Sequence, residues 1–185
     1  MAIAKRRITE PLGGIELTRM RRRHLRRVMS IESRVYPRPW SATLFLSEMA
    51  QKSTRFYIVA KRDGIVIGYA GLMYTGREAH VTNIAVDPEV HHRKVGTRLL
   101  LALIDEALAK GAETLSLEVR VSNHNAQAMY QKFGFTVSGV RKGYYVETRE
   151  DALVMVAEKT RSNAYRARLN ALRAELEEAT GGGRG

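Results

Sequence analysis

Hydrophobic positions along the chain fall into short segments whose spacing is that of either strands or helices. Alternating or continuous apolar runs predict strands at residues 15–17, 56–61, 65–74, 81–86, 114–119, 135–140 and 152–157. The dipeptide Asp63-Gly64, between the second and third runs, is a strong signal for a two-residue hairpin turn. Apolar residues three and four apart predict helices at residues 20–31, 41–49, 95–110, 125–132 and 161–179.

The order of these elements indicates the fold class. Strands predominate before Val86 and alternate with helices after it. This order predicts an α+β fold, an α/β sandwich with a mixed central β-sheet flanked by helices, rather than a doubly wound parallel sheet.

We expect three regions along the chain. Residues 1–14 are basic and contain Pro11 and Gly13-Gly14, which predicts a loose arm. Residues 15–160 form the main domain, and residues 161–185 form an extra C-terminal helix with a Gly-rich tail. That helix carries one narrow apolar stripe, made of Tyr165, Leu169, Leu172 and Leu176. So narrow a stripe predicts a helix that docks on the main domain or a partner without joining the core.

Length and composition exclude several classes of protein. The 185 residues suffice for one ordinary domain with a real core and a short appendage. No apolar run is long enough to span a bilayer, and the basic N-terminus lacks the features of a secretory signal. The absence of cysteine excludes disulfides, thiolate metal sites and a cysteine nucleophile, and fits a reducing compartment. The expected location is therefore cytoplasmic, with no membrane partner.

The net charge of +12 predicts attraction to polyanions. Residues 1–30 carry nine Lys and Arg against two Glu, including the run from Arg21 to Arg27. Such a cluster is typical of nucleic-acid or ribosome contact, but it is equally typical of a solvated face. No RNA-binding motif or set of stacking aromatics accompanies it, so the nucleic-acid interpretation takes second place.

One strand-to-helix connection carries a candidate anion site. Asn83-Ile84-Ala85-Val86-Asp87-Pro88 predicts a buried strand that ends in an Asp-Pro turn, and the basic run from His91 to Thr97 leads into a helix. The first turn of a helix has unpaired N–H groups and a partial positive charge. Gly96 permits close approach of a ligand, and Thr97 offers a hydroxyl. The segment is therefore either a pyrophosphate site for a nucleotide-like cofactor or an ordinary basic turn.

Two side chains farther along are candidates for proton transfer. Glu118 lies in a predicted strand among apolar neighbours, and partly apolar surroundings would raise its pKa towards that of a general base. Alternatively it faces solvent or pairs with Arg120. Tyr130, on a short helix, is either a core residue or a general acid beside a cofactor thiol. Asn123 either hydrogen-bonds peptide-like cofactor groups or caps that helix.

Four histidines, His80, His91, His92 and His124, raise the question of a metal. No HExxH motif is present, and no carboxylate is spaced to complete a ligand set. We expect no metal.

Together these stretches resemble the GNAT acetyltransferases, and most closely their bacterial RimI-type N-terminal acetyltransferase branch. The similarity runs from about Thr82 to Met155, with a weaker match at 38–41. It is carried by Ile-Ala-Val-Asp-Pro and the Leu-rich helix, Leu-Glu-Val-Arg around Glu118, the Tyr130 helix, and the segments Arg141-Lys142-Gly143-Tyr144-Tyr145 and Glu150-Asp151-Ala152. The cofactor loop departs from the family pattern, because His91 replaces Gln or Arg and Lys94 replaces the first glycine.

The resemblance implies the GNAT fold, acetyl-CoA as acetyl donor, and the N-terminal alanine of protein 18 of the small ribosomal subunit as acceptor. It implies that Glu118 is the general base and Tyr130 the general acid. The implied cofactor contacts are Ile84, Ala85 and Val86 for pantetheine, His92, Arg93, Lys94, Val95, Gly96 and Thr97 for pyrophosphate, and Asn123. The implied acceptor contacts are Tyr36, Trp40, Tyr144 and Tyr145.

Two alternatives stay open. The same machinery could acetylate a lysine side chain or a small amine. The chain could instead be a basic ribosome- or RNA-associated protein whose cofactor loop has decayed, an interpretation indicated by His91 and Lys94.

Overall fold

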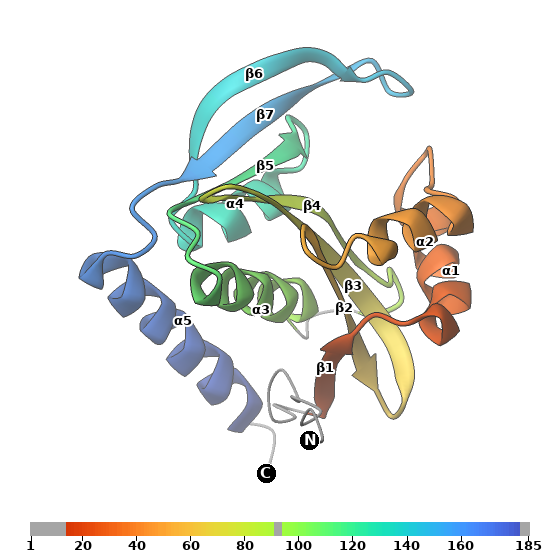
Figure 1. Ribbon diagram of the computed structural model, residues 1–185, viewed down its shortest axis with the longest axis horizontal. Coiled ribbons are helices and arrows are strands. Elements are labelled where there is room, and N and C mark those ends of the chain that lie inside the picture. The colour runs from red at the N-terminus through yellow and green to blue at the C-terminus, as the bar shows by residue number, and fades with distance from the viewer. Residues whose placement is uncertain (1–13, 91–93, 182–185) are drawn as a thin grey trace.

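The computed structural model describes residues 14–90 and 94–181 (Figure 1). Apart from Gly14, the predicted N-terminal arm lies outside the described residues, as do His91, His92 and Arg93. The strands are β1 (Ile15–Arg19), β2 (Arg55–Arg62), β3 (Ile65–Thr75), β4 (Glu78–Val86), β5 (Thr114–Arg120), β6 (Thr136–Tyr145) and β7 (Glu150–Ala157). The helices are the 3₁₀ turn η1 (Arg22–His24), α1 (Leu25–Val35), α2 (Ala42–Ala50), α3 (Val95–Ala109), α4 (His124–Lys132) and α5 (Asn163–Gly181).

The seven strands form one sheet in the order β1-β2-β3-β4-β5-β7-β6. All neighbouring strands are antiparallel except β4 and β5, which are parallel. The predicted mixed sheet and α+β class are therefore confirmed. The predicted Asp63-Gly64 turn is also present, with both residues at positive φ, 51° and 79°.

Both faces of the sheet are covered by helices, as the alternation along β2 illustrates. Ile58 belongs to the larger apolar cluster, which includes Leu99 and Leu103 of α3. Its neighbour Val59 belongs to a second cluster, formed with α1 and α2. Because successive side chains of a strand point to opposite faces, α3 covers one face of the sheet while α1 and α2 cover the other.

Helix α5 lies beside α3 (Figure 1). Its first turn is capped, since the Ser162 hydroxyl accepts the Tyr165 backbone N–H at 3.1 Å. The four stripe residues are 2–6% exposed, and three of them, Tyr165, Leu169 and Leu172, belong to the larger apolar cluster. The helix thus docks on the main domain as expected. The expectation that it stays out of the core was wrong, because a narrow stripe is enough when it closes a gap between other elements.

Several predicted boundaries were also wrong. The strands predicted at 135–140 and 152–157 are too short, because β6 and β7 continue as a long hairpin to the pair Tyr145 and Glu150. Helix α1 begins at Leu25 rather than Met20, whose N–H instead donates to the Tyr57 carbonyl at 2.9 Å. In both cases hydrogen bonds to a distant segment overrode the local pattern.

Strands β4 and β5 separate after a short ladder, and the candidate active site lies where they separate. Only Glu78–His80 pair with Thr114–Ser116. Beyond that point β4 stays paired with β3 as far as Val86, and β5 stays paired with β7 as far as Arg120. The two strands therefore diverge, and their facing edges no longer pair with each other. Among the described helices, none is long and apolar enough to cross a membrane.

Candidate active site

The opened edge of β4 presents backbone groups to the gap. The Ile84 carbonyl accepts a hydrogen bond from the Tyr36 hydroxyl at 3.0 Å, so it points away from β3. The Asp87 N–H points the other way, to the Ile67 carbonyl at 2.9 Å. Because backbone groups alternate in direction along a strand, Ile84 and Val86 face the gap and Ala85 faces β3. Two of the three predicted pantetheine contacts therefore offer backbone groups in a suitable direction.

The start of α3 has the geometry of a glycine-rich loop despite its lysine. Lys94 precedes the helix at φ 50° and ψ 32°, in the left-handed region, which costs a non-glycine residue about 1–3 kcal/mol. Val95 is buried in the apolar cluster, so only its backbone can meet a cofactor. A Cβ at Gly96 would meet Met129 Sδ at 3.6 Å and Val86 Cγ2 at 3.8 Å, both ordinary contacts. Protein packing alone does not require glycine there.

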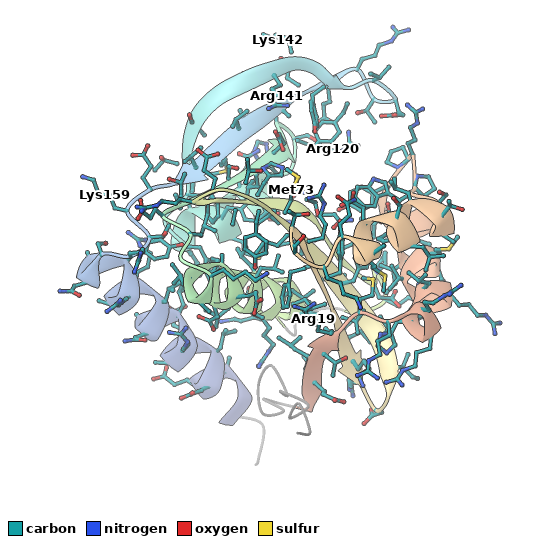
Figure 2. The ribbon with its side chains drawn as sticks, viewed as in Figure 1. Arg19, Met73, Arg120, Arg141, Lys142 and Lys159 are labelled. Carbon is teal, nitrogen blue, oxygen red and sulfur yellow. The ribbon has the colours of Figure 1, made fainter. Side chains whose placement is uncertain are left out.

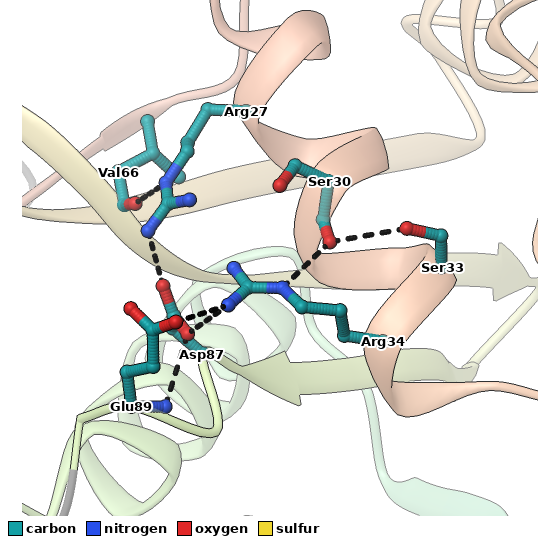
Figure 3. A network of polar contacts seen from close by, with 7 residues as sticks. All are labelled: Arg27, Ser30, Ser33, Arg34, Val66, Asp87 and Glu89. Atoms are coloured by element: carbon teal, nitrogen blue, oxygen red, sulfur yellow. Dashed lines mark hydrogen bonds and ion pairs between the residues drawn. The ribbon is translucent and has the colours of Figure 1, made fainter.

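The turn between β4 and this loop is fixed by α1 (Figure 3). Asp87 is 1% exposed and forms ion pairs with Arg27 and with Arg34, the second at 3.1 Å. The Asp87 carboxylate also accepts the Glu89 N–H at 3.1 Å, and Arg27 donates to the Val66 carbonyl at 3.1 Å. Arg27 therefore has a structural role, although the sequence placed it in a cluster of basic residues suited to polyanions.

Glu118 lies just past the point where β4 and β5 part. Its Oε2 lies 2.9 Å from His80 Nε2, and its Oε1 lies 3.3 Å from Arg141 Nη2. The side chain is only 10% exposed. The hydrogen bond from His80 lowers the pKa of Glu118, assisted by the charges of His80 and Arg141, and outweighs the opposing effect of burial. The predicted raised pKa was therefore wrong, because the sequence does not show which cation faces the carboxylate.

His80 is itself held from the other side. Its Nδ1 lies 2.9 Å from the Ser116 hydroxyl, and the two residues are partners in the β4–β5 ladder. The sequence raised His80 only as a metal ligand. Among the described residues, no group of three His, Cys, Asp or Glu could hold a metal ion. Its actual contact, the carboxylate of Glu118, follows from strand register, which a linear pattern does not give.

The predicted partner Arg120 turns away from Glu118. It pairs with Glu150 at 3.6 Å, and its guanidinium lies 3.8 Å from the centre of the Tyr145 ring. Figure 2 shows Arg120 below the β6–β7 hairpin and Arg141 along the hairpin itself. Arg141, from β6, takes the place by Glu118 that the sequence offered to Arg120.

Three tyrosines gather near the gap. Burial raises the pKa of Tyr130, with a further contribution from Tyr145, so its hydroxyl keeps its proton at neutral pH. Burial also raises the pKa of Tyr36, and Tyr130 and Tyr145 contribute in the same direction. Burial raises the pKa of Tyr145 to about 12, against the lowering effect of Arg120, and Glu118 adds a smaller increase. Tyr145 is therefore within electrostatic reach of both Glu118 and Tyr130.

Two segments border the gap where an acceptor would enter. Tyr144 and Tyr145 stack edge to face, with ring centroids 5.1 Å apart. The turn after them approaches the loop between α1 and α2, because Arg38 and Glu147 form an ion pair at 3.5 Å. The ring of the predicted contact Trp40 packs on Phe45, with centroids 5.3 Å apart.

Two further side chains, Glu32 and Asn123, have hydrogen bonds that define what each can offer at the site. The backbone N–H of Trp40 donates to Glu32 Oε1 at 2.9 Å, and Glu32 is a buried carboxylate that the sequence pattern did not single out. Burial raises the pKa of Glu32. Asn123 caps α4, accepting the Ala126 N–H at 3.1 Å, so its amide nitrogen is the group it offers to a cofactor.

The chain matches the model of the Acetyltransferase (GNAT) family over residues 25–135. It is 39% identical over 127 residues to the ribosomal protein bS18-alanine N-acetyltransferase of Escherichia coli K12, which covers 68% of this chain and 84% of that protein. It is 35% identical over 153 residues to the N-alpha-acetyltransferase RimI of Mycobacterium tuberculosis, covering 80% of this chain and 92% of that protein. The crystal structure of the Escherichia coli ribosomal-protein-S18-alanine N-acetyltransferase superposes with a TM-score of 0.71 at 33% identity, covering 78% of this chain and 94% of that one.

Proposed function

The chain belongs to the acetyltransferase (GNAT) family and uses acetyl-CoA as acetyl donor, and from this premise we propose that it acetylates the N-terminal alanine of ribosomal protein bS18. The names of the relatives from Escherichia coli and Mycobacterium tuberculosis support an N-terminal α-amine as acceptor. The observation that carries the proposal is the position of Glu118, a 10% exposed carboxylate held by His80 and Arg141 just past the point where β4 and β5 part.

In this proposal Glu118 takes the proton of the acceptor amine. An α-ammonium titrates near pH 8, far above a carboxylate whose pKa is lowered, so direct deprotonation of the ammonium would be unfavourable. The nitrogen becomes much more acidic as its bond to the acetyl carbon forms. A carboxylate kept ionised by His80 and Arg141 is suited to accept the proton at that stage, directly or through one water.

The reaction also needs one hydrogen-bond donor for the acetyl oxygen and another for the departing sulfur, and backbone and tyrosine groups can provide them. Charge develops on the acetyl oxygen as the amine attacks, and a fixed backbone N–H stabilises such charge most effectively in a water-poor site. The N–H groups of Ile84 and Val86 face the gap and are the candidates. The departing sulfur needs a hydrogen-bond donor, and the buried hydroxyl of Tyr130, which keeps its proton at neutral pH, is suited to donate it.

The acceptor would enter as an extended segment between the α1–α2 loop and the β6–β7 turn. Tyr36, Tyr144 and Tyr145 would cover its first residues, while the contact of Trp40 with Phe45 makes that residue a support for the loop. The Arg38–Glu147 ion pair spans this entrance and is exposed on the arginine side, at 81%. Exposed pairs contribute little stability and open readily, so the pair would not block entry.

The test incubates the enzyme with acetyl-CoA and each of three peptides. Turnover is measured as release of the free thiol of CoA, and mass spectrometry locates the acetyl group on the peptide. The first carries the N-terminal sequence of bS18 starting with Ala. The second has the same sequence with a blocked N-terminus and one internal lysine, and the third starts with Ala but is otherwise scrambled. We expect acetylation of the α-amine of the first peptide and none of the second. Turnover of the second peptide alone would favour the lysine alternative, and equal turnover of the first and third would contradict the bS18 assignment.

We further propose that the arginines at the start of α1 contribute a weak ribosome contact, which would place the enzyme in the cytoplasm. Arg21, Arg22, Arg23 and Arg26 are all exposed and form no ion pair with another described residue. Co-sedimentation with small ribosomal subunits should therefore weaken steeply with added salt. Replacing Arg22 and Arg26 by Ala should reduce it, whereas replacing Arg77 and Arg161, exposed arginines elsewhere, should not.

A further inference from the structure

The α1–α2 loop, one of the two segments that border the gap, runs from Tyr36 to Trp40 and is held at both ends by one buried residue of α1. The backbone carbonyl of Glu32 accepts the Tyr36 N–H at 2.9 Å. The carboxylate of Glu32 accepts the Trp40 backbone N–H, also at 2.9 Å. The prolines between them, Pro37 and Pro39, have no N–H to donate. Glu32 therefore fixes where the loop leaves α1 and where it approaches α2.

We propose that Glu32 is a positioning residue for the acceptor, because its carboxylate holds the α1–α2 loop in the shape that receives the acceptor's first residues. The proposal rests on the proposed function, in which this loop covers the acceptor, and it assigns no proton transfer to Glu32. Figure 1 shows the loop on the same side of the molecule as the free end of the β6–β7 hairpin. A shift of the loop would therefore change the width of the entrance between the two segments.

The surroundings of Glu32 make its carboxylate unfavourable for stability alone. Glu32 is 2% exposed, and its Oε2 is buried without a hydrogen-bond partner among the described residues. Burial raises the pKa of Glu32, and the Trp40 N–H is the group that opposes this increase. In the described part of the chain no cation pairs with it, and a buried carboxylate without such a partner costs free energy. The benefit that we assign to it is the shape of the loop.

Tyr36 connects the loop to the reaction site. Its hydroxyl donates to the Ile84 carbonyl at 3.0 Å, on the opened edge of β4, and its ring is one of the surfaces expected to cover the acceptor. The charge of Glu32 contributes to raising the pKa of Tyr36, so the carboxylate is within electrostatic reach of that hydroxyl. The carboxylate thus acts on the acceptor through the loop and Tyr36, without touching the reacting atoms.

Without the carboxylate, the Trp40 end of the loop would rely on the packing of its ring against Phe45. The middle of the loop is tied to the β6–β7 turn by an ion pair of Arg38, which is 81% exposed and opens readily. The loop would then sample more positions, and binding of the acceptor would have to order it at a cost in affinity. Glu118 and the cofactor contacts lie on other elements, so this cost should appear in the KM for the acceptor and not in kcat.

Two substitutions separate the hydrogen bond from the charge. Glu32→Gln keeps the length of the side chain and an acceptor oxygen but removes the charge, whereas Glu32→Asp keeps the charge on a side chain one methylene shorter. With acetyl-CoA saturating, Glu32→Asp should raise the KM for the Ala-starting bS18 peptide by about tenfold. Glu32→Gln should stay near wild type. In both variants kcat, and the dissociation constant for CoA by calorimetry, should change little.

A second measurement follows the loop without any acceptor. Trp40 is the only tryptophan of the chain, so its fluorescence reports on the loop end that Glu32 holds. Quenching by acrylamide should increase in Glu32→Asp and stay unchanged in Glu32→Gln. Leu169→Ala, which weakens packing in the apolar cluster on the opposite face of the sheet, is the control for lost stability. It should alter neither the quenching nor the KM for the acceptor.

Wild-type values of both quenching and KM in Glu32→Asp would overturn the proposal. The reverse order, with KM raised in Glu32→Gln and kept in Glu32→Asp, would overturn it too, because the charge would then serve the acceptor. Glu32→Met, of similar volume but without an acceptor oxygen, replaces Glu32→Asp if that variant fails to fold, and the same increases are expected of it. If wild type does not turn over the peptide, the bS18 assignment fails, while the quenching comparison still decides whether Glu32 holds the loop.

Discussion

His80 Nε2 lies 2.9 Å from Glu118 Oε2, across the last ladder pair before β4 and β5 diverge. Because Glu118 is held ionised, the proton between them resides on His80. The other ring nitrogen, Nδ1, lies 2.9 Å from the Ser116 hydroxyl. Arg141, a residue of β6, pairs with the other carboxylate oxygen of Glu118. Tyr144 and Tyr145, at the end of the same strand, experience the charge of Glu118. The carboxylate is therefore fixed in orientation as well as in charge.

Removing this contact should shift the pH dependence of catalysis. In His80→Ala the burial of Glu118 persists while its principal hydrogen bond is lost, so its pKa rises. The acid limb of kcat/KM should move to higher pH, and His80→Gln, which retains an N–H donor, should move less. Full rate profiles with saturating acetyl-CoA measure the shift. An acid limb that stays in place in His80→Ala would show that Glu118 ionisation does not control the rate.

The same contact predicts a pH-dependent stability. A carboxylate whose pKa is lower in the folded protein stabilises it above the unfolded value of 4.5, and that contribution disappears as the pH falls through the folded pKa. Urea unfolding of wild type should therefore lose more stability below this pH than unfolding of His80→Ala. Parallel curves for the two proteins would contradict this.

Glu118→Gln should lower kcat by about 10²–10⁴-fold, because the amide keeps the shape of the carboxylate but accepts no proton. Cofactor affinity should stay near that of wild type. Part of the rate should return as the pH approaches 8, where the free α-amine becomes abundant. Tyr130→Phe should also lower kcat, without that recovery. Full activity of Glu118→Gln at pH 7, with chemistry rate-limiting, would remove Glu118 from the mechanism.

Asp87 should prove important for stability. It is 1% exposed and pairs with Arg27 and Arg34, so Asp87→Asn would leave two partly buried cations without their carboxylate. We expect a loss of about 3 kcal/mol in the free energy of unfolding, at the lower end for a broken buried pair because both arginines reach solvent. Glu89→Gln is the control, since Glu89 is 78% exposed and should cost less than about 1 kcal/mol. Similar losses in both variants would contradict the assigned role.

The sequence predicted the elements of this fold more reliably than their contacts. The turn at Asp63-Gly64 follows from a local pattern, and the mixed sheet follows from the order of the elements. The surroundings of Glu118 do not, because a strand pattern says which face a residue occupies but not what lies opposite. His80 and Arg141 reach it through the registers of two different strand pairings. The pKa prediction failed for that reason.

Helix α5 shows that a sequence pattern also fails to predict how deeply a helix packs. Its narrow stripe predicted a helix outside the core, yet Leu169 is 2% exposed within the larger apolar cluster. Leu169→Ala should therefore lower the free energy of unfolding by about 2–4 kcal/mol. Arg166→Ala, an exposed change on the same helix, should stay within about 0.5 kcal/mol. A loss below 1 kcal/mol for Leu169→Ala, by chemical denaturation, would restore the picture of a loosely docked appendage.

The left-handed backbone of Lys94 destabilises the fold, whereas its ammonium group can attract the phosphates of CoA. Two substitutions separate these effects. Its φ of 50° suits glycine, so Lys94→Gly should relieve strain and stabilise the fold by about 1 kcal/mol, whereas Lys94→Ala keeps the strain. Both remove the ammonium group at the start of α3, so both should raise the dissociation constant for CoA.

The difference from wild type should shrink with added salt, because exposed charges are screened. Calorimetry of CoA binding at two salt concentrations, together with denaturation in urea, measures both effects. If Lys94→Gly instead binds CoA more tightly than wild type does, the ammonium group contributes nothing to binding. The lysine would then be a defect in the loop, and the alternative of a decayed cofactor site would gain.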